Sequence, residues 1–443
     1  MASNYQVNGV DLSTLFDPIG STTKIADVGY QSGGVDISNI FAGASNGDAT
    51  YNITTNIQSG GTDIKTLFAG WGTTNYPGAL WGQGANIYGE LGTNNTTAYS
   101  SIVQTISGGT NWKQVFMTNG GTGAGTTAAI KTDGTLWMWG TGTVGVLGNN
   151  STVSRSSPVQ TAAGGTNWKQ VSVLGSTTHA IKTDGTLWAW GDGSSGTLGD
   201  GTTVSKSSPV QIGLNTNWKQ VCGPAAIKTD GTLWLWGANV YGTIGDGTAV
   251  SKSSPVQTSS GGTNWKQVSH GQQHVAAIKT DGTLWLWGSN IYGELGNGST
   301  GGATGVSTPT QILGGGTNWK SVACGGATTI AIKTDGTLWA WGRNQSGQLG
   351  TNDLVNRSSP TQITGGGTTW KLISCGIEHI SAIKSDGTLW GCGPGLYIGG
   401  TNGVNYSSPI QSAYGGTSWK SIASGSYGTM GIQSVSYTHL TLP

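Results

Sequence analysis

One phrase of about fifty residues recurs along most of the chain and limits its fold more than any other feature. The phrase reads TNWKQV, then AAIKTDGTLWLWG, then a glycine-rich stretch and SSPVQ. The first Trp of its LW motif lies at positions 81, 137, 188, 234, 285, 339 and 390, and the Trp of its NWK motif lies at 112, 168, 218, 265, 319, 370 and 419. Each series has seven members with spacings between 46 and 56 residues. A period of this length is typical of one blade of a propeller.

The interior of the repeat predicts four strands. An Asp-Gly pair such as Asp281-Gly282 lies between two β-prone runs and accepts the positive φ angles of a tight hairpin turn. Trp285 and Trp287 are two residues apart and point to one face of a strand, while the intervening leucines point to the other. Both faces are therefore apolar, as a blade between two neighbours requires. The strands are WKQVS, HVAAIK, TLWLWG and SSPVQ, and the Pro places the last at the sheet edge.

The number of strands predicts how the ring closes. Six complete blades run from residue 112 to residue 411, with two unpaired strands before them (80–104) and two after them (419–433). Two strands plus two strands complete a seventh blade, which removes open sheet edges. The sequence thus predicts an all-β protein: a seven-bladed propeller of four-stranded antiparallel blades.

The repeated pattern resembles a known family. Over about residues 79–434 the pattern is similar to the regulator of chromosome condensation repeat. The matching features, in order, are Gly, His, an apolar strand, Asp-Gly, L-W-x-W-G and N-x-x-G-x-L-G, the last two as in WGSNIYGELG at 287–296. The resemblance implies a seven-bladed propeller. Gln83 and Cys392 depart from it where a second Trp is expected, and the family's His occurs only as His179, His274 and His379.

Residues 1–70 contain a different repeat. The motif G-x-D-[LI]-x-x-[LI]-F occurs at 9–16, 34–41 and 61–68. Gly ends a strand and Asp caps a helix, so each copy predicts a mixture of strand and short helix. These modules resemble segments of tail and fibre proteins of bacterial viruses, which implies anchoring to other virion proteins. Whether they also join copies of this chain into a homo-oligomer is left open.

The segments divide the chain into three parts. Residues 1–70 form the N-terminal modules and residues 71–434 the propeller. Residues 435–443, VSYTHLTLP, fit neither repeat and resemble a translated sequencing adapter, so we expect this tail to be non-native.

Charge and hydropathy exclude several partners. The net charge is +1, from 20 Lys and Arg against 19 Asp and Glu, so the chain as a whole lacks the basic excess of a nucleic-acid binder. No run of 18 apolar residues is present, which predicts no membrane insertion, and the first residues do not resemble a signal peptide.

The search for catalytic motifs yields only turns. G-x-G-x-x-G strings at 140–145, 191–196 and 296–301 lie between strands, whereas a dinucleotide site needs a helix N-terminus. We therefore predict no enzyme activity and no cofactor. Six lysines each precede an Asp by two residues in the hairpin turns, so we expect their charges to cancel at a solvated turn; they are Lys131, Lys182, Lys228, Lys279, Lys333 and Lys384.

Four residues after the WKQV-type strand form a weak candidate metal set. If this strand lines the central channel, soft ligands from neighbouring blades can face one another; the residues are Cys222, His270, Cys324 and Cys375. Val173 and Ser424 occupy the equivalent position elsewhere, and Cys is a common small buried residue, so the favoured interpretation is no metal.

Variable loops supply the candidate binding residues. The loop 117–127 is five residues longer than its counterparts, and the connection 296–309 is also extended. Tyrosines in N-x-Y-G turns can stack on a sugar or pack a blade junction. The candidates are Thr118, Thr122, Thr126, Ser299, Thr304, Tyr88, Tyr241 and Tyr292.

Three functions follow as hypotheses. The first is a non-enzymatic structural or adhesion protein in the tail or fibre of a virion, made in the host cytoplasm, that recognises a cell-surface glycan or protein. The alternative is a cytoplasmic propeller that binds one protein partner, in the manner of the exchange factors and inhibitors that the family resemblance implies. The third is a glycan-cleaving enzyme whose carboxylates converge from different blades.

Overall fold

The computed structural model describes residues 73–438, apart from 107–108, 119–124, 302–304, 364–366 and 413–415, together with six two-residue strands nearer the N-terminus. The chain divides into two compact units. The larger runs from Tyr76 to Val435, and the remaining residues form the smaller. No helix among the described residues is long and apolar enough to cross a membrane.

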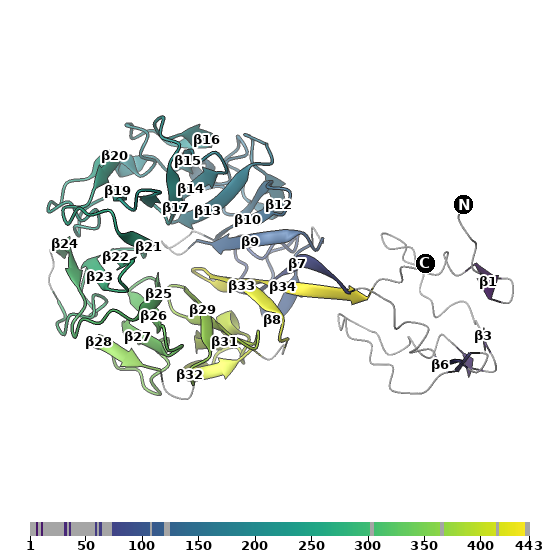
Figure 1. The fold of residues 1–443 in the computed structure, drawn as a ribbon. Helices are drawn as coiled ribbons and strands as arrows, with labels where there is room; N and C mark the ends of the chain where they lie inside the picture. The colour runs from purple at the N-terminus through teal and green to yellow at the C-terminus, as the bar shows by residue number, and fades with distance from the viewer. Residues whose placement is uncertain are drawn as a thin grey trace. The chain divides into compact units, whose positions relative to one another are not determined.

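The larger unit is a ring of seven four-stranded antiparallel sheets, as the repeat predicts (Figure 1). Blades 1 to 6 follow one another along the chain. Blade 1 comprises β9 (Trp112–Met117), β10 (Thr126–Lys131), β11 (Leu136–Gly140) and β12 (Arg155–Gln160). Blade 2 comprises β13 (Trp168–Leu174), β14 (Thr177–Lys182), β15 (Leu187–Gly191) and β16 (Lys206–Gln211). Blade 3 comprises β17 (Trp218–Val221), β18 (Ala225–Lys228), β19 (Leu233–Gly237) and β20 (Lys252–Gln257). Blade 4 comprises β21 (Trp265–His270), β22 (His274–Lys279), β23 (Leu284–Gly288) and β24 (Val306–Gln311). Blade 5 comprises β25 (Trp319–Cys324), β26 (Thr328–Lys333), β27 (Leu338–Gly342) and β28 (Arg357–Gln362). Blade 6 comprises β29 (Trp370–Cys375), β30 (Ile380–Lys384), β31 (Leu389–Pro394) and β32 (Asn405–Gln411). Short helical turns η3 (Thr143–Gly145), η4 (Ser194–Gly196) and α3 (Gly395–Ile398) follow the third strands of blades 1, 2 and 6.

The seventh blade joins the two ends of the ring. Its strand order is β33 (Trp419–Ser424), β34 (Gly428–Thr438), β7 (Thr73–Gly84) and β8 (Tyr99–Gln104), so two late strands pair with two early ones. Figure 1 shows yellow β34 beside the dark β7. The predicted closure is confirmed, and β34 also includes the first four residues of the 435–443 segment.

The smaller unit contains three hairpins at equivalent places of the three N-terminal modules. They pair β1 (Gln6–Val7) with β2 (Val10–Asp11), β3 (Gln31–Ser32) with β4 (Val35–Asp36), and β5 (Gln58–Ser59) with β6 (Thr62–Asp63). The strand part of the predicted mixture is therefore observed. The short helices expected after each Asp lie outside the described residues.

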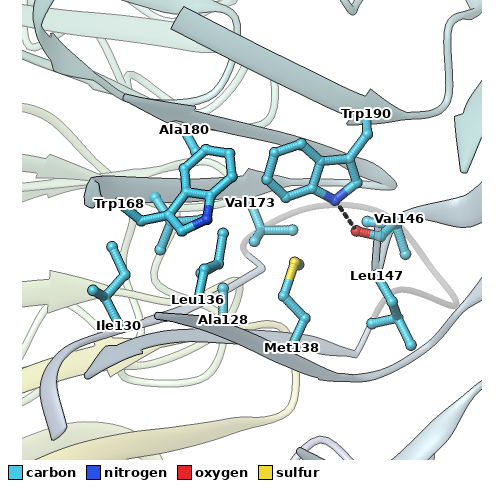
Figure 2. Packing of buried hydrophobic residues seen from close by; sticks show 11 residues of the cluster. Ala128, Ile130, Leu136, Met138, Val146, Leu147, Trp168, Val173, Ala180 and Trp190 are labelled. Atoms are coloured by element: carbon cyan, nitrogen blue, oxygen red, sulfur yellow. Dashed lines mark hydrogen bonds between the residues drawn. The ribbon is translucent and has the colours of Figure 1, made fainter. Parts of the chain in front are cut away.

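Apolar side chains fill the space between adjacent blades. In the cluster of Figure 2, Leu136 and Met138 of blade 1 pack towards Trp168 and Trp190 of blade 2, and all four are buried. Because strand residues alternate in direction, the Trp residues of each LWxW strand meet the preceding blade and its leucine-type residues meet the next. The two apolar faces predicted for the blade are confirmed.

A polar clamp accompanies this packing. The indole N–H of Trp190 donates a 2.8 Å hydrogen bond to the carbonyl of Val146 in the preceding blade (Figure 2). Thr178 donates to the same carbonyl at 2.9 Å. Gly148 adopts a positive φ of 63° and a Cβ there would lie 2.5 Å from Trp190 Nε1, which explains the invariant glycine of the G-x-L-G turn. Equivalent indole bonds of 2.7 to 3.0 Å join Trp139 to Glu90, Trp236 to Thr197, Trp287 to Thr243 and Trp341 to Glu294.

The first strand of each blade lies nearest the ring axis and is called the inner strand, and the fourth is called the outer strand. Side chains form hydrogen bonds with backbone groups at the free edges of inner strands. Gln170 accepts from the backbone N–H of Val221 and donates to its carbonyl, at 3.1 and 3.0 Å. Gln220 makes the same pair of bonds to Val268 in the next blade. An amide side chain carries both a donor and an acceptor, so it substitutes for a neighbouring strand that the ring geometry cannot supply.

We predict that Trp190→Phe lowers the free energy of unfolding by about 1 to 2 kcal/mol, because it removes the indole donor from a buried junction while keeping most of the apolar contact. Urea denaturation followed by circular dichroism measures this. Trp188→Phe is the matched control, since the Trp188 indole is half-buried and bonds only Thr186 in its own turn. An equal loss in both variants would contradict the clamp.

Candidate functional site

The strand directions sort the loops onto two faces. Each Asp-Gly hairpin joins the second and third strands of a blade at one end, and we call that end the Asp-Gly face. The turns between first and second strands lie at the other end, together with the long connections between third and fourth strands. In blade 4, for example, the N–H of Ser289 in the long connection donates to the carbonyl of Gln273 in the turn between the first two strands. We call this second end the connection face.

The connection face collects most of the predicted binding residues. Tyr88, Tyr241 and Tyr292 lie half-buried in the connections of the closing blade, blade 3 and blade 4. Ser299 is exposed on the blade 4 connection, whereas Thr122 and Thr304 lie outside the described residues.

Two predicted binding residues are corrected. Thr118 and Thr126 are only 1% and 0% exposed. The hydroxyl of Thr118 donates to Gly175 of blade 2 and that of Thr126 to Thr141, so both fix the ends of the 117–127 loop rather than face a ligand.

A buried asparagine at the start of an N-x-x-G turn organises the connections of the closing blade and of blades 3, 4 and 5. Asn239 is fully buried; its Oδ1 accepts from the N–H of Ile244 and its Nδ2 donates to the carbonyls of Thr248 and Val250. Asn86, Asn290 and Asn344 make the corresponding bonds in their blades. In the sequence, this asparagine can be identified because it recurs five residues before the Leu or Ile of the G-x-L-G turn.

Tyr292 belongs to a row of side chains that crosses three blades. The guanidinium of Arg343 in blade 5 lies 5.7 Å from the centre of the Tyr292 ring. Arg343 also forms an ion pair of 3.9 Å with Glu378, in the turn between the first two strands of blade 6. Ile291, next to Tyr292 in the chain, is 43% exposed, and Val240, at the equivalent position of the blade 3 connection, is 69% exposed. Tyr, Arg and exposed aliphatic side chains on one face are the composition of protein-binding surfaces.

Tyr88 has a different environment in the closing blade. Its backbone N–H donates to Oε2 of Glu90 at 2.8 Å, and its ring lies against Gly125 of blade 1. Burial raises the pKa of Glu90, an effect that its hydrogen bonds partly oppose. The carboxylate thus supports the turn, and the packing interpretation of this tyrosine is favoured over sugar stacking.

The candidate metal set lies around a cavity of about 170 Å³ on the ring axis, lined by residues from all seven blades. The backbone N–H of His270 donates to Cys222 Sγ at 3.3 Å, and burial raises the pKa of Cys222, Cys324 and Cys375. Metal binding needs the thiolate. Among the described residues no group of three or more His, Cys, Asp or Glu side chains can hold a metal ion, and none of the four cysteines is in a disulfide.

The three family histidines are buried in blade junctions. His274 and His379 bond the hydroxyls of Thr329 and Thr429 in the next blade, at 2.9 and 3.0 Å, and His179 bonds the carbonyl of Thr197 at 3.0 Å. Burial lowers the pKa of His274 to about 4 and that of the other two to about 3. These side chains therefore stay neutral and structural.

On the Asp-Gly face no ion pair among the described residues joins a hairpin Lys to its Asp, although the nearby Lys helps to lower the pKa of the carboxyl, and each side chain has closer partners. Lys182 Nζ lies 4.8 Å from the ring centre of Trp168 and 4.0 Å from that of Trp188, and each of the six hairpin lysines has such a pair of rings. Asp184 instead accepts from the N–H and hydroxyl of Thr186, which lowers the pKa of its carboxyl. The aromatic rings attract the cation while the threonine fixes the carboxylate.

These features define a class of protein, the seven-bladed propellers whose repeat unit carries an LWxW strand, which reads LWGQ at 80–83 and LWGC at 389–392. The sequence matches the Regulator of chromosome condensation (RCC1) repeat over residues 133–181, 184–223, 230–278, 281–332 and 335–383, and a second form of that repeat over 319–348. The matched residues exceed half of the chain, so the chain belongs to the RCC1 repeat family.

Similar proteins come from plants, animals and yeast. The chain is 31% identical over 282 residues to the ultraviolet-B receptor UVR8 of Arabidopsis thaliana, covering 61% of this chain and 63% of that protein. It is 34% identical over 131 residues to the probable E3 ubiquitin-protein ligase HERC3 of Homo sapiens, or 29% of this chain and 12% of the ligase. The chain therefore spans less than two thirds of each of these relatives.

Solved structures show the same fold. Prp20p of Saccharomyces cerevisiae superposes with a TM-score of 0.70 at 16% identity, covering 85% of this chain and 95% of Prp20p. Human WBSCR16 gives 0.68 at 18% identity, covering 80% and 98%.

We predict that acidification weakens the propeller through its buried histidines. The unfolded chain takes up a proton at His274 below about pH 6.5 whereas the folded chain does so only near pH 4, so stability is complete above pH 6.5 and falls below it. At pH 5 the loss is about 2 kcal/mol for this site. Urea denaturation at pH 7 and pH 5 should show a smaller drop for His274→Gln than for the unaltered chain. Identical drops would exclude this origin.

Proposed function

We propose that the chain is a non-enzymatic interaction module that binds one protein partner through the connection face of its propeller. The observation that carries the proposal is the row Tyr292–Arg343–Glu378, on the same face as the exposed Ile291 and Val240. This area combines apolar side chains that water solvates poorly with a charged pair oriented by its neighbours.

The restrained Arg343 favours blades 4 to 6 as the centre of the interface, because exposed valines occur on other blades too. Covering the exposed part of a Val or Ile gives a fraction of the about 1.5 to 3 kcal/mol that burial of the whole side chain contributes. Arg343 is already restrained by Tyr292, by Glu378 and by Gln345, to which its Nε donates at 2.9 Å. A restrained Arg loses little entropy on binding, which favours a partner that supplies a further acceptor.

Relatives support protein binding over attachment to a virion. The solved structure of Prp20p is described with its binding to Gsp1p and histones, and another as Kap60 bound to yeast RCC1 (Prp20). UVR8 and HERC3 are named as a receptor and a probable ligase of a plant and of humans. The tail or fibre interpretation depended on the N-terminal modules, and none of these relatives supports it.

The glutamates of the connection face give little support to a glycan-cleaving enzyme. Glu378 is paired with Arg343, Glu90 accepts the N–H of Tyr88, and Glu294 accepts from Ser289, Ile291 and Tyr292. Each carboxylate thus already serves the fold. A binding role needs no free acid and base.

We predict that Val240→Glu with Ile291→Glu abolishes capture of the partner, because two buried carboxylates would replace apolar contacts. Tagged chain is cross-linked and purified from cells of its source, and partners recovered near equimolar amounts are quantified by mass spectrometry. Val153→Glu with Val204→Glu is the matched control, since these valines are 56% and 58% exposed just before the outer strands of blades 1 and 2. A partner retained by the first double variant would refute this site.

A further inference from the structure

The Asp-Gly face carries a second ring of lysines, apart from the six in the hairpins. Each blade has a Lys directly after the first Trp of its inner strand, at the end of the strand that lies on this face. All seven side chains are exposed: Lys113, Lys169, Lys219, Lys266, Lys320, Lys371 and Lys420. In blade 2 the register shifts between Trp168 and Gln170, so Lys169 lies at an irregularity in the pairing of the first two strands. The first strands of the other six blades shift at the same place.

These lysines add to the six that end the second strands. The Asp-Gly face then has thirteen lysines and the six hairpin aspartates, a formal charge of +7. The other charged residues of the propeller lie in the turns, connections and outer-strand starts at the opposite end, and number five basic and seven acidic, a charge of −2. The near-neutral total conceals a strongly polarised ring.

The six hairpin aspartates offset six of the thirteen lysines, and seven positive charges remain on this face. None of the ion pairs found within the described residues involves any of the thirteen lysines. The six hairpin lysines lie over Trp rings at 3.9 to 4.9 Å, which fixes their positions, and the connections that complete this face contain no charged residue. Charges of one sign arranged in a ring focus the electrostatic potential and attract an oppositely charged partner.

We propose that the Asp-Gly face binds an acidic protein segment rich in Asp and Glu. The fixed aspartates decide against nucleic acid: every hairpin places a carboxylate two residues from a lysine, and the hydrogen bonds from Thr keep it ionised. A continuous phosphate backbone would meet these carboxylates unpaired, whereas a polypeptide can present amide or ammonium donors between its acids. This face is opposite to the connection face, so the proposal is independent of the function proposed above.

The test is the fluorescence anisotropy of a labelled oligoglutamate peptide titrated with the full chain at low and at physiological salt. We expect saturable binding that weakens with salt, because exposed charges are screened over about 10 Å. An oligolysine peptide of equal length should not bind, and an oligothymidine of equal charge should bind more weakly than oligoglutamate. Tighter binding of oligothymidine, or no binding of oligoglutamate, would overturn the proposal.

Matched double variants locate the site. Lys219→Gln with Lys266→Gln removes two charges from the ring on adjacent blades, and should weaken peptide binding by about fivefold or more. Arg155→Gln with Lys206→Gln removes the same charge at the starts of the outer strands β12 and β16, and should leave the affinity within about twofold. Equal weakening in both variants would show a response to net charge alone and would refute a site on the Asp-Gly face. Circular dichroism spectra establish that both variants are folded.

Discussion

The indole hydrogen bond between blades is the interaction on which the rest of the structure depends. Sheets packed face to face can slide, because apolar contact is non-directional. The bond from Trp190 to the Val146 carbonyl, with the Thr178 hydroxyl on the same oxygen, fixes one blade against the next in register. Repetition of the clamp at five junctions fixes the angles between these blades, and so the positions of the connections and hairpins that they carry.

The closing blade shows how a departure from the repeat preserves this interaction. Gln83 occupies the position of the clamping Trp, and its Nε2 donates to the carbonyl of Tyr397 in blade 6, at 3.3 Å. Thr429 donates to the same carbonyl at 2.8 Å. The amide therefore replaces the indole as donor, with less apolar area, where β34 and β7 meet. Cys392 in blade 6 has no comparable donor, so that junction depends more on packing around Cys392 and Ile363.

The fold was predictable because each blade repeats the same information. Seven copies of LW and NWK average out local ambiguity, and the unpaired strands at 80–104 and 419–433 required one particular closure. Side-chain partners were less predictable, since they depend on the neighbouring blade. The spacing of Lys182 and Asp184 predicted that their charges attract, but it did not predict that the Lys lies over Trp168 of its own blade or that the Asp binds Thr186. Likewise Thr118 looked like part of a free loop until its bond to blade 2 was known.

A conserved scaffold residue and a recognition residue are hard to separate in one sequence, and the two faces show why. The Asn recurs in four connections because it supports the backbone, and the variable residues beside it, such as Val240 and Ile291, are free to suit a partner. On the Asp-Gly face the recurring Lys is itself exposed, and no packing role explains it. A structural residue at such a position would be buried or bonded, as the adjacent Trp and Gln are. Recurrence without burial therefore points to a property of the whole ring, its electrostatic field, which no single blade can produce.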